Sequence, residues 1–194
     1  MLLLVRHGEA TANAAGLLLG RSDVPLTPRG REQAAAIGPR LGDVARLVSS
    51  PLRRALDTAA ALGLPLPVEV DDRWVEVDYG EHEGVALGDV PADVWRRWRE
   101  DPEFRPAGGE SLAAVGRRVG AACEELFAPD RGAARSSDEH VVVVSHVSPV
   151  KAAVAWALGA GDDLAWRLFL STGSVTRIGW GNGGPVLHGY NWVP

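Results

Sequence analysis

Two stretches of the chain, residues 1–5 and 141–144, are apolar without any polar alternation. Such runs are typical of strands that are buried on both faces of a parallel sheet. Between them lies a stripe of apolar residues whose spacings of three and four are typical of a helix packed on one side: Leu112, Val115, Val119, Ala122 and Leu126. The two periods together indicate a fold that combines buried strands with amphipathic helices.

Caps and chain-breaking residues mark further elements. Thr27 and Pro28 predict the N-cap and the first residue of a helix, and the polar, small residues over 129–139 predict a mobile surface loop. The other predictions, in chain order, are a strand over 45–48, a helix from Pro51, a strand or extended segment ending at 69–72, a helix over 92–100, a helix from Ser148 to about Leu158, and a hairpin at the sheet edge over 173–191.

The alternation of strands and helices predicts an α/β fold, a three-layer α/β/α sandwich with a mostly parallel central sheet. The chain has 194 residues and shows neither an internal repeat nor a linker. Its length is that of one domain. We therefore expect a single domain spanning residues 1–194.

Composition narrows the class of protein. The formal net charge of −5 argues against a general affinity for nucleic acid or anionic membranes, and no stretch approaches transmembrane length. The short apolar run at the N-terminus lacks a preceding basic region and so is not a secretory signal, which makes the cytoplasm the expected location. Cys123 is the only cysteine, and no group of residues has metal-ligand spacing. Neither a metal nor a cofactor is expected.

Arg6, His7 and Gly8 directly follow the first predicted strand. Open α/β sheets bind their ligands at the carboxyl ends of strands. A guanidinium suits phosphate, an imidazole is a nucleophile near neutral pH, and a glycine lets the backbone approach a ligand closely. The tripeptide alone fits a surface turn without chemistry equally well. The rest of the sequence must therefore decide between a catalytic site and a surface turn.

Four segments resemble, in the same order, the motifs of the histidine phosphatase superfamily, also called the phosphoglycerate mutase-like family: residues 6–9 with Asn13, 49–59, 76–84 and 141–146. The resemblance implies the phosphoglycerate mutase-like fold and phosphoryl transfer through a phosphohistidine. After His146 the family often has two glycines, whereas this chain continues with residues 147–151, Val-Ser-Pro-Val-Lys. That sequence is similar to acid phosphatase domains fused to ribonuclease H in actinobacteria, which resemble α-ribazole phosphatases. The resemblance therefore favours the phosphatase branch.

The resemblance also implies a role for each catalytic residue. His7 attacks phosphorus through Nε2 while a nearby backbone carbonyl holds its other ring nitrogen. Arg6 and Arg54 neutralise the phosphate oxygens, and His146, in a protonated form, is a further hydrogen-bond donor. Glu76 protonates the departing alkoxide and then activates water to hydrolyse the phosphohistidine. No metal takes part.

Three more residues are expected to bind substrate. Asn13 donates a hydrogen bond to a phosphate oxygen, and the backbone N–H of Val147 reaches phosphate. Ser148, together with Lys151, contacts the leaving group. Trp74, Trp95 and Trp98 lie where the family builds its substrate lid, although tryptophans are more often packing residues.

Several assignments have rivals in the sequence. Arg53 is an alternative to Arg54 as the arginine that binds phosphate, and the position directly before Ala55 favours Arg54. Glu81 and Glu83 are alternatives to Glu76 as the proton donor. The spacing from Gly80 favours Glu76, and Glu83 is expected to be structural.

The sequence also leaves two alternatives to the expected function. A phosphomonoester hydrolase acting on a small phosphorylated metabolite is the expected function. A phosphoglycerate mutase is one alternative, disfavoured because the segment 84–111 is shorter than the cation-rich insertion of those enzymes. A phosphate-binding module without catalysis is the other, disfavoured because all five catalytic residues are present.

Overall fold

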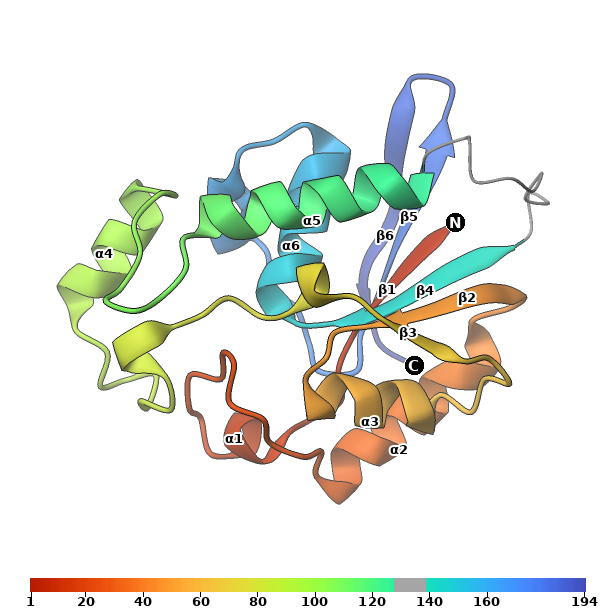
Figure 1. Ribbon diagram of the computed structural model, residues 1–194, viewed down its shortest axis with the longest axis horizontal. Helices are drawn as coiled ribbons and strands as arrows, with labels where there is room; N and C mark the ends of the chain where they lie inside the picture. The colour runs from red at the N-terminus through yellow and green to blue at the C-terminus, as the bar shows by residue number, and fades with distance from the viewer. Residues whose placement is uncertain (128–138) are drawn as a thin grey trace.

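The computed structural model describes residues 1–127 and 139–194, and six strands form its one central sheet (Figure 1). The strand order is β3-β2-β4-β1-β5-β6. The first four of these strands run parallel, whereas β5 and β6 are antiparallel to their neighbours. The bounds are β1 Leu2–Arg6, β2 Val44–Ser49, β3 Val68–Val70, β4 His140–Ser145, β5 Val175–Gly181 and β6 Gly184–Trp192. The predicted mostly parallel sheet with an edge hairpin is confirmed.

Helices cover both faces of this sheet. The α-helices are α1 Thr11–Ala14, α2 Pro28–Ile37, α3 Arg53–Ala61, α4 Ala92–Glu100, α5 Leu112–Phe127 and α6 Val147–Leu158. Short 3₁₀ helices η1 Gly38–Arg40, η2 Asp72–Trp74, η3 Gly80–His82 and η4 Asp162–Arg167 join them. In Figure 1, α5 and α6 lie on one side of the strands and α2 and α3 on the other. The predicted three-layer α/β/α sandwich is therefore confirmed.

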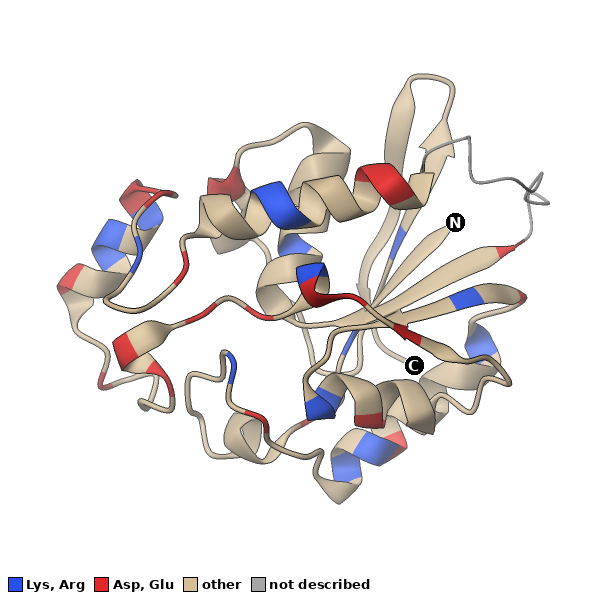
Figure 2. Ribbon diagram, in the orientation of Figure 1, with Lys and Arg blue, Asp and Glu red and all other residues tan. Residues whose placement is uncertain are grey.

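Alternate residues of the central strands pack into two separate hydrophobic cores, one on each face of the sheet. Leu4 and Val143 point to the α5–α6 side, while Val5 and Val144 point to the side of α2 and α3. Because the side chains of a strand alternate between the faces of its sheet, a strand covered on both sides needs an unbroken apolar run. Figure 2 shows the matching charge pattern, with the central strands largely uncharged along their length.

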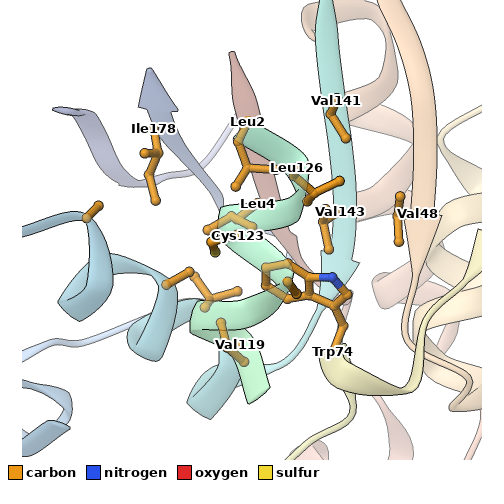
Figure 3. Packing of buried hydrophobic residues seen from close by; sticks show 14 of the residues in the cluster. Leu2, Leu4, Val48, Trp74, Val119, Cys123, Leu126, Val141, Val143 and Ile178 are labelled. Carbon is orange, nitrogen blue, oxygen red and sulfur yellow. The ribbon is translucent and has the colours of Figure 1, made fainter. Parts of the chain in front are cut away.

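Trp74 belongs to the core on the α5–α6 side. Its side chain is fully buried, and Figure 3 shows it packed beside Val119 and Val143. Asp71, which caps η2 by accepting a hydrogen bond from Arg73 N–H across 2.9 Å, turns the chain so that Trp74 faces inward. Trp74 is therefore a packing residue and takes no part in a lid.

One predicted boundary differs from the structure. The helix expected from Pro51 begins at Arg53, since Leu52 has extended backbone angles and is the N-cap. The strand expected to end at 69–72 does end there, at Val70, because Asp71 begins the cap of η2. The loop predicted over 129–139 lies, except for residue 139, outside the described residues. No helix in the described ranges is long and apolar enough to cross a membrane.

Candidate active site

Buried polar side chains gather where β1, β2 and β4 end. His7 follows β1, Ser50 follows β2 and His146 follows β4, and these parallel strands place all three at the same sheet edge. The rings of His7 and His146 lie with their centroids 5.1 Å apart. Two further polar side chains there, Arg54 and Glu76, are also buried. The structure thus brings together residues that are far apart in the sequence.

His7 is held as a neutral imidazole with a free nucleophilic nitrogen. Its Nδ1 lies 2.7 Å from the carbonyl oxygen of Gly8. A carbonyl only accepts hydrogen bonds, so Nδ1 carries the proton and the lone pair is on Nε2. Burial, and then the positive charges of Arg6 and Arg54, lower the pKa of His7 well below its ordinary value. The ring is therefore unprotonated at Nε2 at neutral pH.

Gly8 fixes the backbone that carries this carbonyl. Its N–H donates to Thr58 Oγ1 across 3.1 Å. A Cβ at Gly8 would overlap the carbonyl oxygen of Gly30 on α2, so any larger residue would push the loop away from the helix. Glycine is required here by close approach rather than by an unusual dihedral angle.

Arg54 enters the site from the start of α3. Its side chain is buried, and its Nη1 and Nη2 groups donate to the carbonyl oxygens of Ser22 and Gly20 across 2.8 and 2.6 Å. The neighbouring Arg53 is exposed and pairs with Asp57 one turn along the helix. One residue of displacement on a helix turns a side chain by about 100°. The structure thus places Arg54 at the site and Arg53 outside it.

His146 is neutral in this structure, which differs from the expected protonated form. Arg54 Nε–H donates to His146 Nδ1 across 3.2 Å, which requires a lone pair on that nitrogen. His146 Nε2 lies 2.7 Å from Ser50 Oγ and is therefore the nitrogen that carries the proton. Burial, and then the charge of Arg54, lower the pKa of His146 well below its ordinary value. His146 is still a hydrogen-bond donor, but through a neutral ring.

Arg6 presents a buried donor without a partner among the described residues. Its Nη1 donates to the carbonyl oxygen of Leu170 across 2.5 Å, while no described residue accepts a hydrogen bond from its Nε–H. Burial lowers the pKa of Arg6, and the nearby charge of Glu76 opposes that shift. Since buried polar groups are nearly always hydrogen-bonded, the Nε–H is a natural contact for a bound oxyanion.

The carboxylate of Glu76 sits at the N-terminus of α6. It accepts hydrogen bonds from the backbone N–H groups of Val77 across 2.8 Å, Val147 across 3.0 Å and Ser148 across 3.1 Å. A helix N-terminus favours a negative group through its free N–H donors and its dipole. In this structure the N–H of Val147, expected to reach phosphate, is thus bonded to Glu76.

The rival glutamates have other partners. Glu83 accepts hydrogen bonds from the backbone N–H groups of Gly20 across 2.9 Å and Ser22 across 3.1 Å, and so shapes the loop whose carbonyls hold Arg54. Glu81 is largely exposed. Among the three glutamates, Glu76 is the one buried beside the histidines.

Asn13 is the expected site residue with the weakest connection to the other site residues through hydrogen bonds. It lies on α1, where its Oδ1 accepts a hydrogen bond from the N–H of Ala10 across 3.1 Å. Its hydrogen bonds to described residues do not include the buried histidines or arginines. Its amide NH₂ group is the donor left for a ligand.

Ser50 and Thr58 are site residues that sequence reasoning missed. Ser50 accepts from His146, and Thr58 accepts from Gly8 N–H while donating to the carbonyl oxygen of Arg54 across 2.7 Å. Thr58 stands four residues after Arg54, on the same face of α3, and this spacing was the available signal. Within the described ranges, no group of three or more histidine, cysteine, aspartate or glutamate residues is placed to hold a metal ion.

Comparison with known proteins gives a consistent result. The model of the histidine phosphatase superfamily (branch 1) matches residues 2–193. A glucosyl-3-phosphoglycerate phosphatase of Mycolicibacterium vanbaalenii is 40% identical over 186 residues, which cover 91% of this chain and 82% of that protein. A solved structure of a mycobacterial glucosyl-3-phosphoglycerate phosphatase with VO3 is 32% identical, with a TM-score of 0.88 and 98% of each chain covered.

A longer relative also matches. A bifunctional protein of Mycobacterium tuberculosis is 39% identical over 183 residues, which cover 90% of this chain but 49% of that protein. The chain therefore spans about half the length of this relative.

Proposed function

Because this chain belongs to the histidine phosphatase superfamily (branch 1), we propose that it is a metal-independent phosphomonoester hydrolase that works through a phosphohistidine on His7. Its substrate is a small phosphorylated metabolite. The observation that carries the proposal is the 2.7 Å contact between His7 Nδ1 and the Gly8 carbonyl, which leaves Nε2 as a nucleophile among buried cations. Relatives that are phosphatases support the same reaction class.

In the first half-reaction, His7 Nε2 attacks phosphorus and the ester P–O bond breaks. The bond pair leaves with the alcohol oxygen, which takes a proton from Glu76 in its protonated form. General acid catalysis of this kind is worth about 10²–10⁴-fold. The product on the protein is a phosphohistidine.

The phosphoryl oxygens need donors that stay in place as charge moves during transfer. Arg6 offers its Nε–H, which has no partner among residues 1–127 and 139–194. Arg54 uses three of its donor groups on Gly20, Ser22 and His146, which leaves about two of its five N–H bonds for phosphate. His146 offers the proton on Nε2, now directed at Ser50, and Asn13 offers its amide.

In the second half-reaction, Glu76 takes a proton from water as the water oxygen attacks phosphorus. The P–N bond to His7 breaks, and inorganic phosphate leaves. The backbone N–H groups of Val147 and Ser148 hold the Glu76 carboxylate in place for this step. We also propose that residues 1–194 form one domain and act in the cytoplasm.

Phosphorus NMR separates this proposal from its rivals. The protein is incubated with 3-phosphoglycerate, phosphoserine and other phosphorylated metabolites. A hydrolase releases inorganic phosphate, a mutase converts 3-phosphoglycerate into its isomer, and a binding module leaves every spectrum unchanged. Phosphate release supports the proposal, and either other outcome overturns it.

A further inference from the structure

A cavity of about 170 Å³ lies beside Glu76. Val77, Val147 and Ser148 line it, and the N–H groups of these same three residues donate to the Glu76 carboxylate. In the proposed reaction Glu76 protonates the alcohol oxygen. The rest of the alcohol therefore extends from the Glu76 side of the site, toward this cavity.

The far walls of the cavity are aromatic. Trp95 and Trp98 come from α4, and Trp166 comes from η4. Trp95 meets Trp166 edge to face with ring centroids 6.1 Å apart, and Trp166 Nε1–H donates to the carbonyl oxygen of Trp98 across 3.1 Å. These contacts lock α4 against η4, so the walls are preformed. An apolar cavity of about 150 Å³ is known to bind benzene, so this cavity has room for one ring.

The same cavity contains a cation, Lys151, the only lysine of the chain. Its Nζ donates to the carbonyl oxygen of Ala165 across 2.8 Å, and no carboxylate of a described residue forms an ion pair with it. An ammonium has three N–H donors, so two remain. Burial lowers the pKa of Lys151, and the nearby charge of Glu76 opposes that shift without making a direct ion pair. An anionic ligand group can take the two remaining donors and pair with the charge directly. A cation beside flat apolar walls suits a ring that bears an anionic, oxygen-rich substituent.

We propose that this cavity is a leaving-group site that selects phosphomonoesters of a single-ring alcohol bearing a carboxylate or similar anionic oxygen group. The ring packs against Trp95 and Trp166, and the anionic group pairs with Lys151. This inference rests on the proposed function, because it takes the alcohol to lie on the Glu76 side. Aromatic and pyranose rings share the required flat apolar face, and the test separates them.

The test compares kcat/KM for esters whose leaving groups are all primary alkoxides. Benzyl phosphate carries an aromatic ring, glucose 6-phosphate a pyranose, ethyl phosphate no ring, and 4-carboxybenzyl phosphate a ring with a carboxylate. At least one ring ester is expected to exceed ethyl phosphate by about tenfold or more. The carboxylate is expected to add about another tenfold over benzyl phosphate.

Variants assign each preference to its residue. Trp95→Leu is expected to lower the ratio of ring ester to ethyl phosphate. Lys151→Met is expected to bring the ratio of 4-carboxybenzyl to benzyl phosphate close to one, and Lys151→Arg to restore it. A merely structural role for Lys151 would slow all esters alike and leave that ratio unchanged. Trp180→Leu, at an exposed position on β5, is the matched control and should change neither ratio.

Two outcomes would overturn the proposal, and they are distinguishable. Equal kcat/KM for all four esters, with phosphate still released, would refute the leaving-group site while the phosphatase function stands. Failure to hydrolyse any ester, together with an unphosphorylated His7, would refute the proposed function itself.

Discussion

Arg54 Nε–H donates a hydrogen bond to Nδ1 of His146 across 3.2 Å, joining two residues that stand 92 positions apart in the sequence. The contact fixes which nitrogen of His146 carries its proton. Nε2–H is then the donor, and Ser50 Oγ holds it 2.7 Å away. The guanidinium thus adds positive charge to the site and also orients the second histidine.

Replacement of Arg54 is expected to be far more damaging than replacement of its neighbour. Arg54→Ala removes both a buried phosphate donor and the group that orients His146, and the loss of one such donor costs about 10²–10³-fold in kcat. Arg53→Ala removes an exposed side chain that pairs with Asp57 and should leave kcat almost unchanged. Steady-state kinetics with one substrate gives both values. Equal losses would show that the wrong arginine has been placed in the site.

Acidification is expected to destabilise the fold through His7 and His146. Burial is the first cause of the lowered pKa of both residues. In the unfolded chain both titrate near the ordinary value of 6.5. Below that pH the unfolded state binds more protons, so the free energy of unfolding falls as pH falls. The slope is at most about 1.4 kcal/mol per pH unit for each histidine.

Urea unfolding between about pH 7 and about pH 5.5 measures this slope, in a range where most carboxylates stay ionised. His7→Gln removes one of the two groups and should make the slope shallower. An unfolding free energy that rises on acidification, or a slope indifferent to His7→Gln, would contradict the assigned protonation states.

The fold was more predictable than the site because it depends on local patterns. β1 and β4 are unbroken apolar runs, since helices cover both of their faces, and Thr27 accepts a hydrogen bond from the N–H of Gly30, as its N-cap role requires. The motifs also placed His7 and Arg54. The charge state of His146 was expected wrongly, because it depends on Arg54, which reaches it only through the tertiary fold.

The difference between local sequence patterns and tertiary contacts also explains which other site features could not be predicted. Ser50 has an ordinary sequence context and becomes a site residue only because β2 and β4 are neighbours. The cavity beside Glu76 needs α4 and η4 to pack together. No periodic signal marked η4, a 3₁₀ helix of six residues, Asp162–Arg167.

Chelation is expected to leave the rate unchanged. The proposed chemistry stabilises phosphate with Arg6, Arg54 and His146 and assigns no step to a metal. Vanadate, which adopts the five-coordinate geometry of phosphorus in the transition state, should inhibit. Assays with and without a chelator, and with increasing vanadate, check both effects. A rate lost on chelation and restored only by magnesium or zinc would refute a metal-free mechanism.

The role of Glu76 is tested by the leaving group. An alkoxide needs a proton as its P–O bond breaks, whereas p-nitrophenolate departs readily without one. Glu76→Gln should therefore slow phosphorylation of His7 by about 10²–10⁴-fold with an alkyl phosphate and nearly spare it with p-nitrophenyl phosphate. The measurement is the pre-steady-state burst, because Glu76 also activates water in the second step.

Glu81→Gln is the matched control for this experiment, because Glu81 is a largely exposed glutamate. It should leave both bursts unchanged. Equal losses for the two leaving groups in Glu76→Gln would make Glu76 a positioning residue instead of the acid.

The central claim is that His7 carries the phosphoryl group between the two half-reactions. The direct measurement mixes the protein with a phosphomonoester, quenches within the burst in alkaline denaturant, and locates the phosphate by peptide mass spectrometry. Phosphohistidine is stable in base and labile in acid. The account predicts phosphate on His7 in the native protein and none in His7→Gln. Phosphate retained by that variant, or found on any other residue of the native protein, would contradict it.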